Sequence, residues 1–310
     1  MNVEKKERAV SRKYVRKQFG TIGLLLIIYA LFSLHFPLVL NIFFQESAPD
    51  IVNDKLMYYG IYFIIIVFGT VIPFFFLRKI FHLPLKKFNQ SISASFVDLF
   101  VQAIVFFVVC IALTYISNLL FSYIGMEGKL ISGIGLSYDD ANLSNPLYIF
   151  MLILVTPLLE EYAFRGVLLN ILSRYGKRFA LVASAIIFAL AHLNFAEMIP
   201  AFAMGVQLGK TELRYKSIQP TIVIHVLFNA IIYGLCVIPA SITKYMAYGI
   251  AAIVFIAAYL IVSGRYERIR IKKLHKSKTT NIMFYTTPAI LIAMFLMVLH
   301  TVLFAYITVR

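Results

Sequence analysis

Apolar stretches of about twenty residues recur along this chain of 310 residues, and they limit the folds that it can adopt. A helix needs about 20 mostly apolar residues to cross the hydrocarbon layer of a membrane. Such stretches lie near 21–44, 58–77, 97–123, 147–172, 179–195, 219–238, 244–263 and 283–308. The sequence therefore predicts an all-α fold, a polytopic integral membrane helix bundle with eight to nine transmembrane helices.

A further short segment, 197–209, decides between eight and nine crossings. Its Gly205 and Gly209 form a small-xxx-small pair, which would allow close packing in the protein interior. Lys and Arg gather in cytoplasmic loops of membrane proteins, and here they alternate from loop to loop without a break only when this segment is counted. The pattern favours nine crossings of a cell membrane, with the N-terminus cytoplasmic and the C-terminus outside.

Composition excludes a soluble fold and disfavours a nucleic-acid partner. Hydrophobic residues make up 61% of the chain and charged residues 14%, well below the charged share of about 25% in soluble domains. The net charge of +15 comes from short basic runs between apolar stretches, so we assign it to cytoplasmic loops. Cys110 and Cys236 both lie in apolar stretches, without the spacing of a zinc site. The predicted surroundings are therefore the lipid bilayer.

Polar residues interrupt the apolar stretches at a cost of at least about 2.5–3.5 kcal/mol for each Asp, Lys or Arg at a helix centre. They form three groups on separate predicted spans: Glu160, Glu161 and Arg165; His192; and His225 with Asn229. Glu161 and Arg165 are four residues apart, so they share a helix face and can pair. Glu160 is rotated by about 100° from its neighbour and stays the freer carboxylate.

These residue types can supply both functions that peptide hydrolysis needs. A buried carboxylate near a histidine can deprotonate water, and a second histidine with an asparagine can stabilise the oxyanion at a peptide carbonyl. Zinc is the alternative, held by Glu160, His192 and His225 with water in the fourth position. Because the H-E-x-x-H and H-x-x-E-H patterns are both absent, we favour a metal-free site without a cofactor.

The order of these groups resembles the signature of the CAAX-protease and bacteriocin-processing (CPBP) family of intramembrane proteases. That signature reads E-E-x-x-x-R, then F-x-x-x-H, then H-x-x-x-N. This chain matches it from Glu160 to Arg165, from Phe188 to His192 and from His225 to Asn229. The resemblance covers 147–240 and implies that this part is the catalytic core. Three of the predicted spans precede it in 1–146, and C-terminal spans follow it in 241–310.

The resemblance also implies a role for each group. Glu160 would activate the attacking water with His192 beside it, while His225 and Asn229 would form the oxyanion site. Glu161 and Arg165 would brace the helix.

The expected activity is hydrolysis of a peptide bond in a membrane-associated protein or peptide, and whether prenylation matters is open. A non-catalytic scaffold that regulates a sensor kinase or confers bacteriocin immunity is the alternative, although it would not need the complete set of motifs. A transporter with a Glu and His proton relay is a third possibility, but inverted repeats are not evident.

Overall fold

The computed structural model of the protein describes residues 3–84, 95–123, 145–193, 195–237 and 278–308. Within these ranges every regular element is an α-helix or a π-helix, which confirms the all-α class. The predicted span 244–263 lies outside the described residues.

The helices are named in chain order, and η marks π-helical segments. They are α1 (Val3–Tyr29), η1 (Ala30–His35), α2 (Phe36–Ser47), α3 (Pro49–Asn53), α4 (Lys55–Ile80), α5 (Phe96–Tyr123), α7 (Pro146–Phe150), η3 (Met151–Val155), α8 (Thr156–Glu160), η4 (Glu161–Leu169), α9 (Asn170–Ser173), α10 (Lys177–Leu190), α11 (Phe195–Tyr215), α12 (Gln219–Cys236), α14 (Lys278–Tyr285) and α15 (Pro288–Thr308).

Length and composition identify four candidate membrane spans in the described part of the chain. These are Arg12–Ser47, Lys55–Ile80, Phe96–Ser117 and Pro146–Ser173. Two shorter apolar helices, Gln219–Gly234 and Pro288–Leu303, match two further predicted spans. The chain is therefore a helical membrane protein, and a count of eight or nine crossings stays a prediction.

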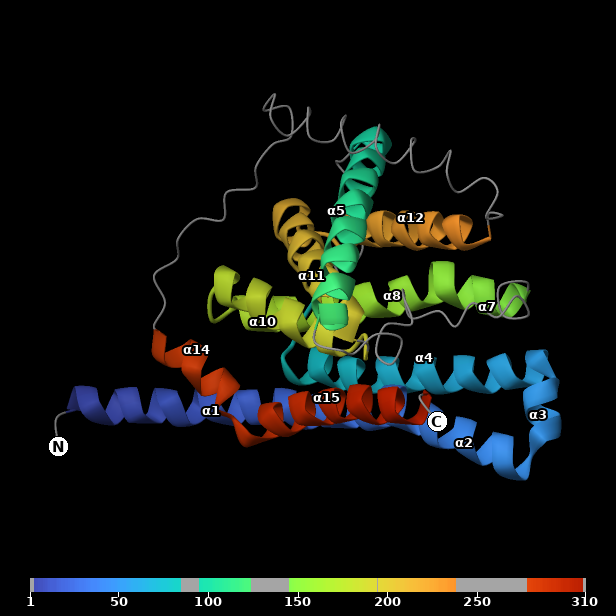
Figure 1. Cartoon of the computed structure of the whole chain (residues 1–310). Coiled ribbons are helices and arrows are strands. Elements are labelled where there is room, and N and C mark those ends of the chain that lie inside the picture. The colour runs from blue at the N-terminus through green and yellow to red at the C-terminus, as the bar shows by residue number, and fades with distance from the viewer. Residues whose placement is uncertain (1–2, 85–94, 124–144, 194, 238–277, 309–310) are drawn as a thin grey trace.

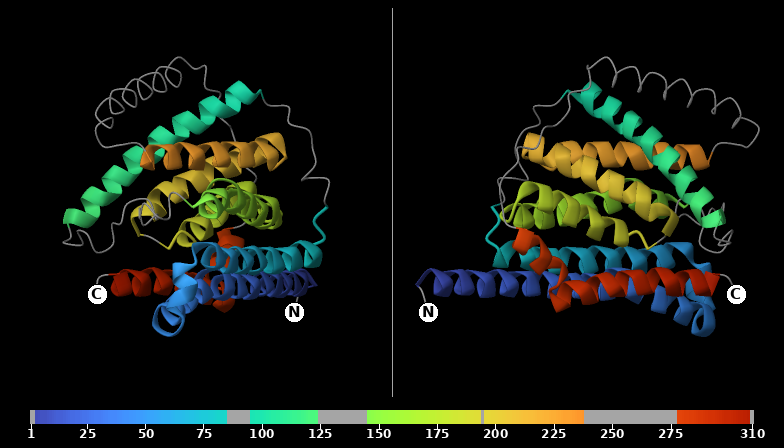
Figure 2. Two further views of the ribbon diagram at one scale, coloured as in Figure 1. Left: turned by 90° about the vertical axis from the view of Figure 1, so that its right-hand side faces the viewer. Right: turned by 60° about the vertical axis from the view of Figure 1, so that its left-hand side comes forward.

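The helices lie in layers. Helices α1 and α15 lie side by side at one edge, next to α4, and the chain from α7 to α10 follows (Figure 1). Helices α11 and α12 form the next layer, and α5 crosses both of them obliquely (Figure 2). The segment with the two glutamates therefore lies in the middle of the molecule.

Close approach of α1 and α15 depends on a glycine. A Cβ atom built on Gly23 would lie 2.6 Å from the backbone carbon of Ala289. Further along both helices the rings of His35 and His300 meet, with their centroids 4.8 Å apart. Since residue numbers rise together on both sides of this interface, α1 and α15 run in the same direction (Figure 1).

The predicted short segment at 197–209 is part of a longer helix, α11, which runs to Tyr215. Its two glycines pack against α10, as the small-xxx-small spacing predicts. A Cβ on Gly205 would lie 2.9 Å from the Cα of Ala185, and a Cβ on Gly209 would lie 2.6 Å from Leu181 Cδ1. The predicted end at residue 209 was wrong because charged residues follow it, yet one of them, Glu212, is only 2% exposed.

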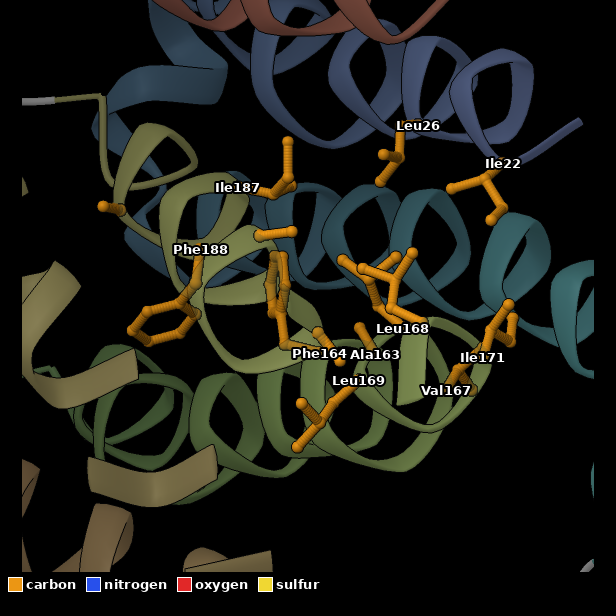
Figure 3. Packing of buried hydrophobic residues seen from close by; sticks show 14 of the residues in the cluster. Ile22, Leu26, Ala163, Phe164, Val167, Leu168, Leu169, Ile171, Ile187 and Phe188 are labelled. Carbon is orange, nitrogen blue, oxygen red and sulfur yellow. The ribbon is translucent and has the colours of Figure 1, made fainter. Parts of the chain in front are cut away.

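An apolar core holds η4 in place from the side of α1 and α10. Figure 3 shows Phe164 and Leu168 of η4 in this core, together with Ile187 of α10 and Leu26 of α1. All four side chains are at most 1% exposed. Between helices in lipid, close packing of this kind replaces the hydrophobic effect as the main attraction.

Candidate active site

The two glutamates stand where an α-helix changes into a π-helix. Glu160 is the last residue of α8 and Glu161 is the first residue of η4. Short π-helical insertions of this kind often occur at functional sites, because they change which side chains share a face. The sequence analysis assumed a regular α-helix at this place, so the π-helix is a difference that the structure reveals.

Glu161 is held between a cation and an imidazole. Its Oε1 lies 3.0 Å from Arg165 Nη1, the predicted pair, and 2.8 Å from His225 Nδ1. Glu161 is fully buried, and Arg165 and His225 are 2% and 3% exposed. Because buried charges are stable only when they are paired and hydrogen-bonded, the three side chains form one buried unit.

Glu160 differs from Glu161 in exposure and in its contact with His225. Its side chain is 22% exposed, and its Oε2 lies 3.6 Å from His225 Nε2. The imidazole of His225 therefore lies between the two carboxylates. When Glu161 is ionised it can only accept, so His225 Nδ1 donates to it and Nε2 faces Glu160. Of the two carboxylates, Glu160 is the one that is partly exposed.

Phe188 connects the remaining motif residues through its ring. The Arg165 guanidinium carbon lies 4.0 Å from the centroid of this ring, a cation–π contact. The rings of His192 and His225 meet Phe188 at centroid distances of 4.6 Å and 6.2 Å. Phe188 is fully buried, so it sets the spacing between His192 in the turn after α10, His225 of α12 and Arg165 of η4.

The orientation of His192 follows from a single hydrogen bond. Its Nδ1 lies 2.8 Å from the carbonyl oxygen of Phe188. A carbonyl only accepts, so Nδ1 carries the proton and Nε2 of the neutral ring is the acceptor. Glu160 and His225 both lie within electrostatic reach of this ring. His192 can therefore accept a proton through Nε2.

Asn229 lies apart from this group in its contacts. Its Nδ2 donates to the carbonyl oxygen of Leu152, 2.9 Å away, and so connects α12 to η3. The described contacts thus bring together Glu160, Glu161, Arg165, His192 and His225, while Asn229 fastens two helices. Its expected part in an oxyanion site stays a prediction.

An apolar cavity of about 360 Å³ opens beside His192. Its walls come from three helices, with Cys110 and Thr114 from α5, Met204 from α11 and Phe228 from α12. Cavities of this size with an apolar lining and few polar groups are typical of ligand sites. The cavity therefore gives an apolar group access to one member of the polar cluster.

The predicted zinc ligands do not form a three-ligand group. Among the residues that the structure describes, no three His, Cys, Asp or Glu side chains are arranged to hold a metal ion. Of the named ligands, His225 uses Nδ1 for Glu161 and His192 uses Nδ1 for a backbone carbonyl, so each keeps Nε2 available. Metal dependence stays a matter for experiment.

Sequence reasoning missed three residues around this cluster. Tyr29 of α1 is buried within electrostatic reach of Glu160, and no local pattern marked it. Asn170 follows η4 and hydrogen-bonds Glu212 of α11. The signal for this pair was available: Asn170 is a polar residue inside a predicted span, and Glu212 lies three residues beyond the Gly209 that packs on α10.

The fold and the site define a class of protein, a helical membrane protein with a buried cluster of carboxylates, imidazoles and a guanidinium beside an apolar cavity. Comparison with known families agrees. Residues 142–231 match the family described as "Type II CAAX prenyl endopeptidase Rce1-like", and these residues contain all three motifs. Through this central region the chain is similar to the CAAX-protease (CPBP) family.

A curated relative supports this assignment. The "Membrane-embedded CAAX protease MroQ" of Staphylococcus aureus (strain USA300) is 36% identical over 94 residues, which is 28% of this chain. The chain spans 38% of the length of that relative. No solved structure matches the chain.

Proposed function

We propose that the protein is an intramembrane endopeptidase that hydrolyses a peptide bond of a membrane-associated protein or peptide. One observation carries the proposal: Glu160 is a partly exposed carboxylate at the edge of a buried cluster with Arg165 and His225. A carboxylate in this position can accept a proton from water, while the buried unit behind it keeps the histidine in place.

In this proposal Glu160 takes a proton from water as the water oxygen attacks the peptide carbonyl carbon. The carbonyl oxygen becomes an oxyanion, which His225 stabilises in its protonated form while Glu161 holds Nδ1. When the C–N bond breaks, Glu160 returns the proton to the leaving amine. His192, beside Glu160, assists the proton transfer.

The apolar cavity supports a substrate with apolar residues next to the scissile bond. It opens at His192 and is lined by Met204, Phe228 and Ile232. Because most of its lining is apolar, apart from a few groups such as Thr114, His192 and Glu197, large apolar side chains fit it best. The cell membrane supplies substrates of this kind.

The parallel direction of α1 and α15 supports an odd number of crossings. Two helices that cross a membrane in the same direction are separated by an even number of reversals, and so by an odd number of intervening spans. If α1 is the first span and α15 the last, the total is odd, as nine is and eight is not. We therefore propose nine crossings, with the N-terminus in the cytoplasm where basic residues gather.

Cleavage of fluorogenic membrane-peptide substrates by purified protein in detergent tests the activity. Replacing Glu160→Gln should lower kcat by about a hundredfold or more, since a general base contributes roughly 10²–10⁴. Glu46→Gln, the same change at an exposed residue, should leave kcat unchanged. Equal activity of the wild type and Glu160→Gln would contradict the proposal, and loss of activity with a zinc chelator would point to a metal.

A further inference from the structure

In the part of the chain that the structure describes, the π-helical segments η1 and η3 share a local sequence feature that η4 lacks, a proline just after the segment. Segments η1 and η3 each end two residues before a proline, Pro37 and Pro157. Proline has no N–H and so removes one hydrogen bond of the α-helical pattern, which favours a different register just before it. No proline lies within η4 or in the residues up to Gly176. Something else must favour the π register of η4.

The side chain of Asn170 contacts the backbone of η4. Its Nδ2 donates to the carbonyl oxygens of Arg165 at 2.7 Å and Gly166 at 3.2 Å. The same nitrogen donates to Glu212 Oε1 at 3.1 Å. An amide NH₂ group has two protons, so one serves Glu212 and the other is shared between the two carbonyls. Asn170 is 6% exposed, so water competes little for these bonds.

Glu212 is placed by the close packing of α11. Gly209, three residues earlier, lies against Leu181 of α10 and Leu169 of η4. This brings the Glu212 side chain to Asn170 in an environment where it is 2% exposed. A carboxylate acceptor makes a shorter and stronger bond than a neutral one. It therefore fixes which way the Asn170 amide points.

We propose that Glu212 and Asn170 are positioning residues that hold η4 in its π register. Because α- and π-helices differ in residues per turn, a return to the α register would rotate Glu161 and Arg165 relative to His225 and Phe188, their neighbours outside η4. The rotation would loosen the hold of Glu161 on His225. The kinetic part of this inference rests on the proposed protease activity, whereas the part about the register does not.

Kinetics with matched variants test the effect on catalysis. Glu212→Leu and Asn170→Leu should each lower kcat about tenfold or more with KM unchanged, because small misplacements of reacting groups are costly. Glu212→Gln keeps an oxygen acceptor and should stay near the wild type. The kcat of the double variant should be no lower than that of the slower single variant, because both substitutions break the same contact between Asn170 and Glu212.

The control is Thr211→Val, at the neighbouring buried residue of α11, whose hydroxyl donates to the carbonyl oxygen of Gln207 in its own helix. It should leave kcat unchanged. If Glu212→Leu and Asn170→Leu keep the wild-type kcat, or if Thr211→Val lowers kcat as much as they do, the positioning role is wrong.

Hydrogen exchange tests the register without any substrate. Amides of 161–171 should exchange at least about tenfold faster in Glu212→Leu and Asn170→Leu than in the wild type, because the carbonyls lose a donor. Amides of α12 should be unchanged. Unchanged exchange in 161–171 would overturn the proposal. If the wild type cleaves no peptide, but Glu212→Leu and Asn170→Leu show the faster exchange in 161–171, the protease function is contradicted and the positioning role is supported.

Discussion

The π-helical segments η1 and η4 both have a side chain that hydrogen-bonds to a backbone carbonyl oxygen of the segment, but they lie in different surroundings. In each, a side chain at or just after the end donates to a carbonyl oxygen five residues earlier. His35 Nδ1 lies 3.0 Å from Ala30 O, and Asn170 Nδ2 lies 2.7 Å from Arg165 O. Behind His35 stands the ring of His300, whereas behind Asn170 stands the carboxylate of Glu212.

The two segments have similar backbone geometry, but they differ in the charge of the residues that they contain and contact. Segment η1 has a proline after it and an uncharged contact, Ser33 Oγ to Thr70 Oγ1 at 3.1 Å. Segment η4 carries Glu161 and Arg165, both buried and paired. Both irregular segments are therefore supported by two other helices. Segment η1 meets Thr70 of α4 and the ring of His300 of α15. Segment η4 meets α11 and α12 through carboxylates, Glu212 bound to Asn170 and Glu161 bound to His225.

The largest effect should follow from breaking the charged unit of η4. Arg165→Leu leaves the fully buried Glu161 without its cation, a loss of about 3–5 kcal/mol for a buried pair. We expect a sharp fall in the midpoint of thermal unfolding in detergent. Arg165→Lys keeps the charge and serves as the control. An unfolding midpoint near that of the wild type for Arg165→Leu would mean that the two π segments are supported alike.

A smaller effect should follow from Phe188→Leu, which keeps apolar volume and removes the aromatic face. The guanidinium of Arg165 would lose a cation–π contact worth roughly 2 kcal/mol when desolvated. We expect a moderate fall in the unfolding midpoint and a lower kcat, since His192 and His225 also pack on this ring. Phe74→Leu, at an equally buried ring away from Arg165, is the control. Equal effects on kcat would argue against a special role for Phe188.

The smallest effect should come from Ser33→Ala in η1. Loss of its hydrogen bond to Thr70 should cost about 1 kcal/mol, and kcat should not change, because η1 carries no member of the charged cluster. Peptide cleavage and thermal unfolding of the same preparation measure both quantities. A loss of kcat as large as that of Glu212→Leu would remove the distinction between the two segments.

Sequence reasoning reached the helical class, the close packing of Gly205 and Gly209, and the pairing of Glu161 with Arg165. Each depends on composition or on spacing within one helix, and such signals are local. The π register of η4 was not predictable in this way, because a spacing of 3.6 residues per turn is assumed before any pairing is considered. Glu212 lies beyond the predicted end of the short segment 197–209, because charged residues on either side of it end the apolar run.

The same limit explains why the contacts of Asn229 could not be predicted from the sequence. From the sequence, its place one turn after His225 suggested a shared task for the two side chains. In the structure they share a helix but contact different neighbours, Leu152 for Asn229 and the two glutamates for His225. Which neighbour a side chain meets depends on how helices pack against one another, and a single helix does not contain that information.

The pairing of α1 with α15 has a consequence for how the chain is assembled. The chain is synthesised from α1 towards α15, so the face of α1 around Gly23 lacks its α15 neighbour during most of synthesis. In that interval lipid or an insertion factor must cover it. The interface between α1 and α15 forms after the central helices are in the bilayer. A ribosome that stalls before α15 would leave this face of α1 accessible to membrane quality control.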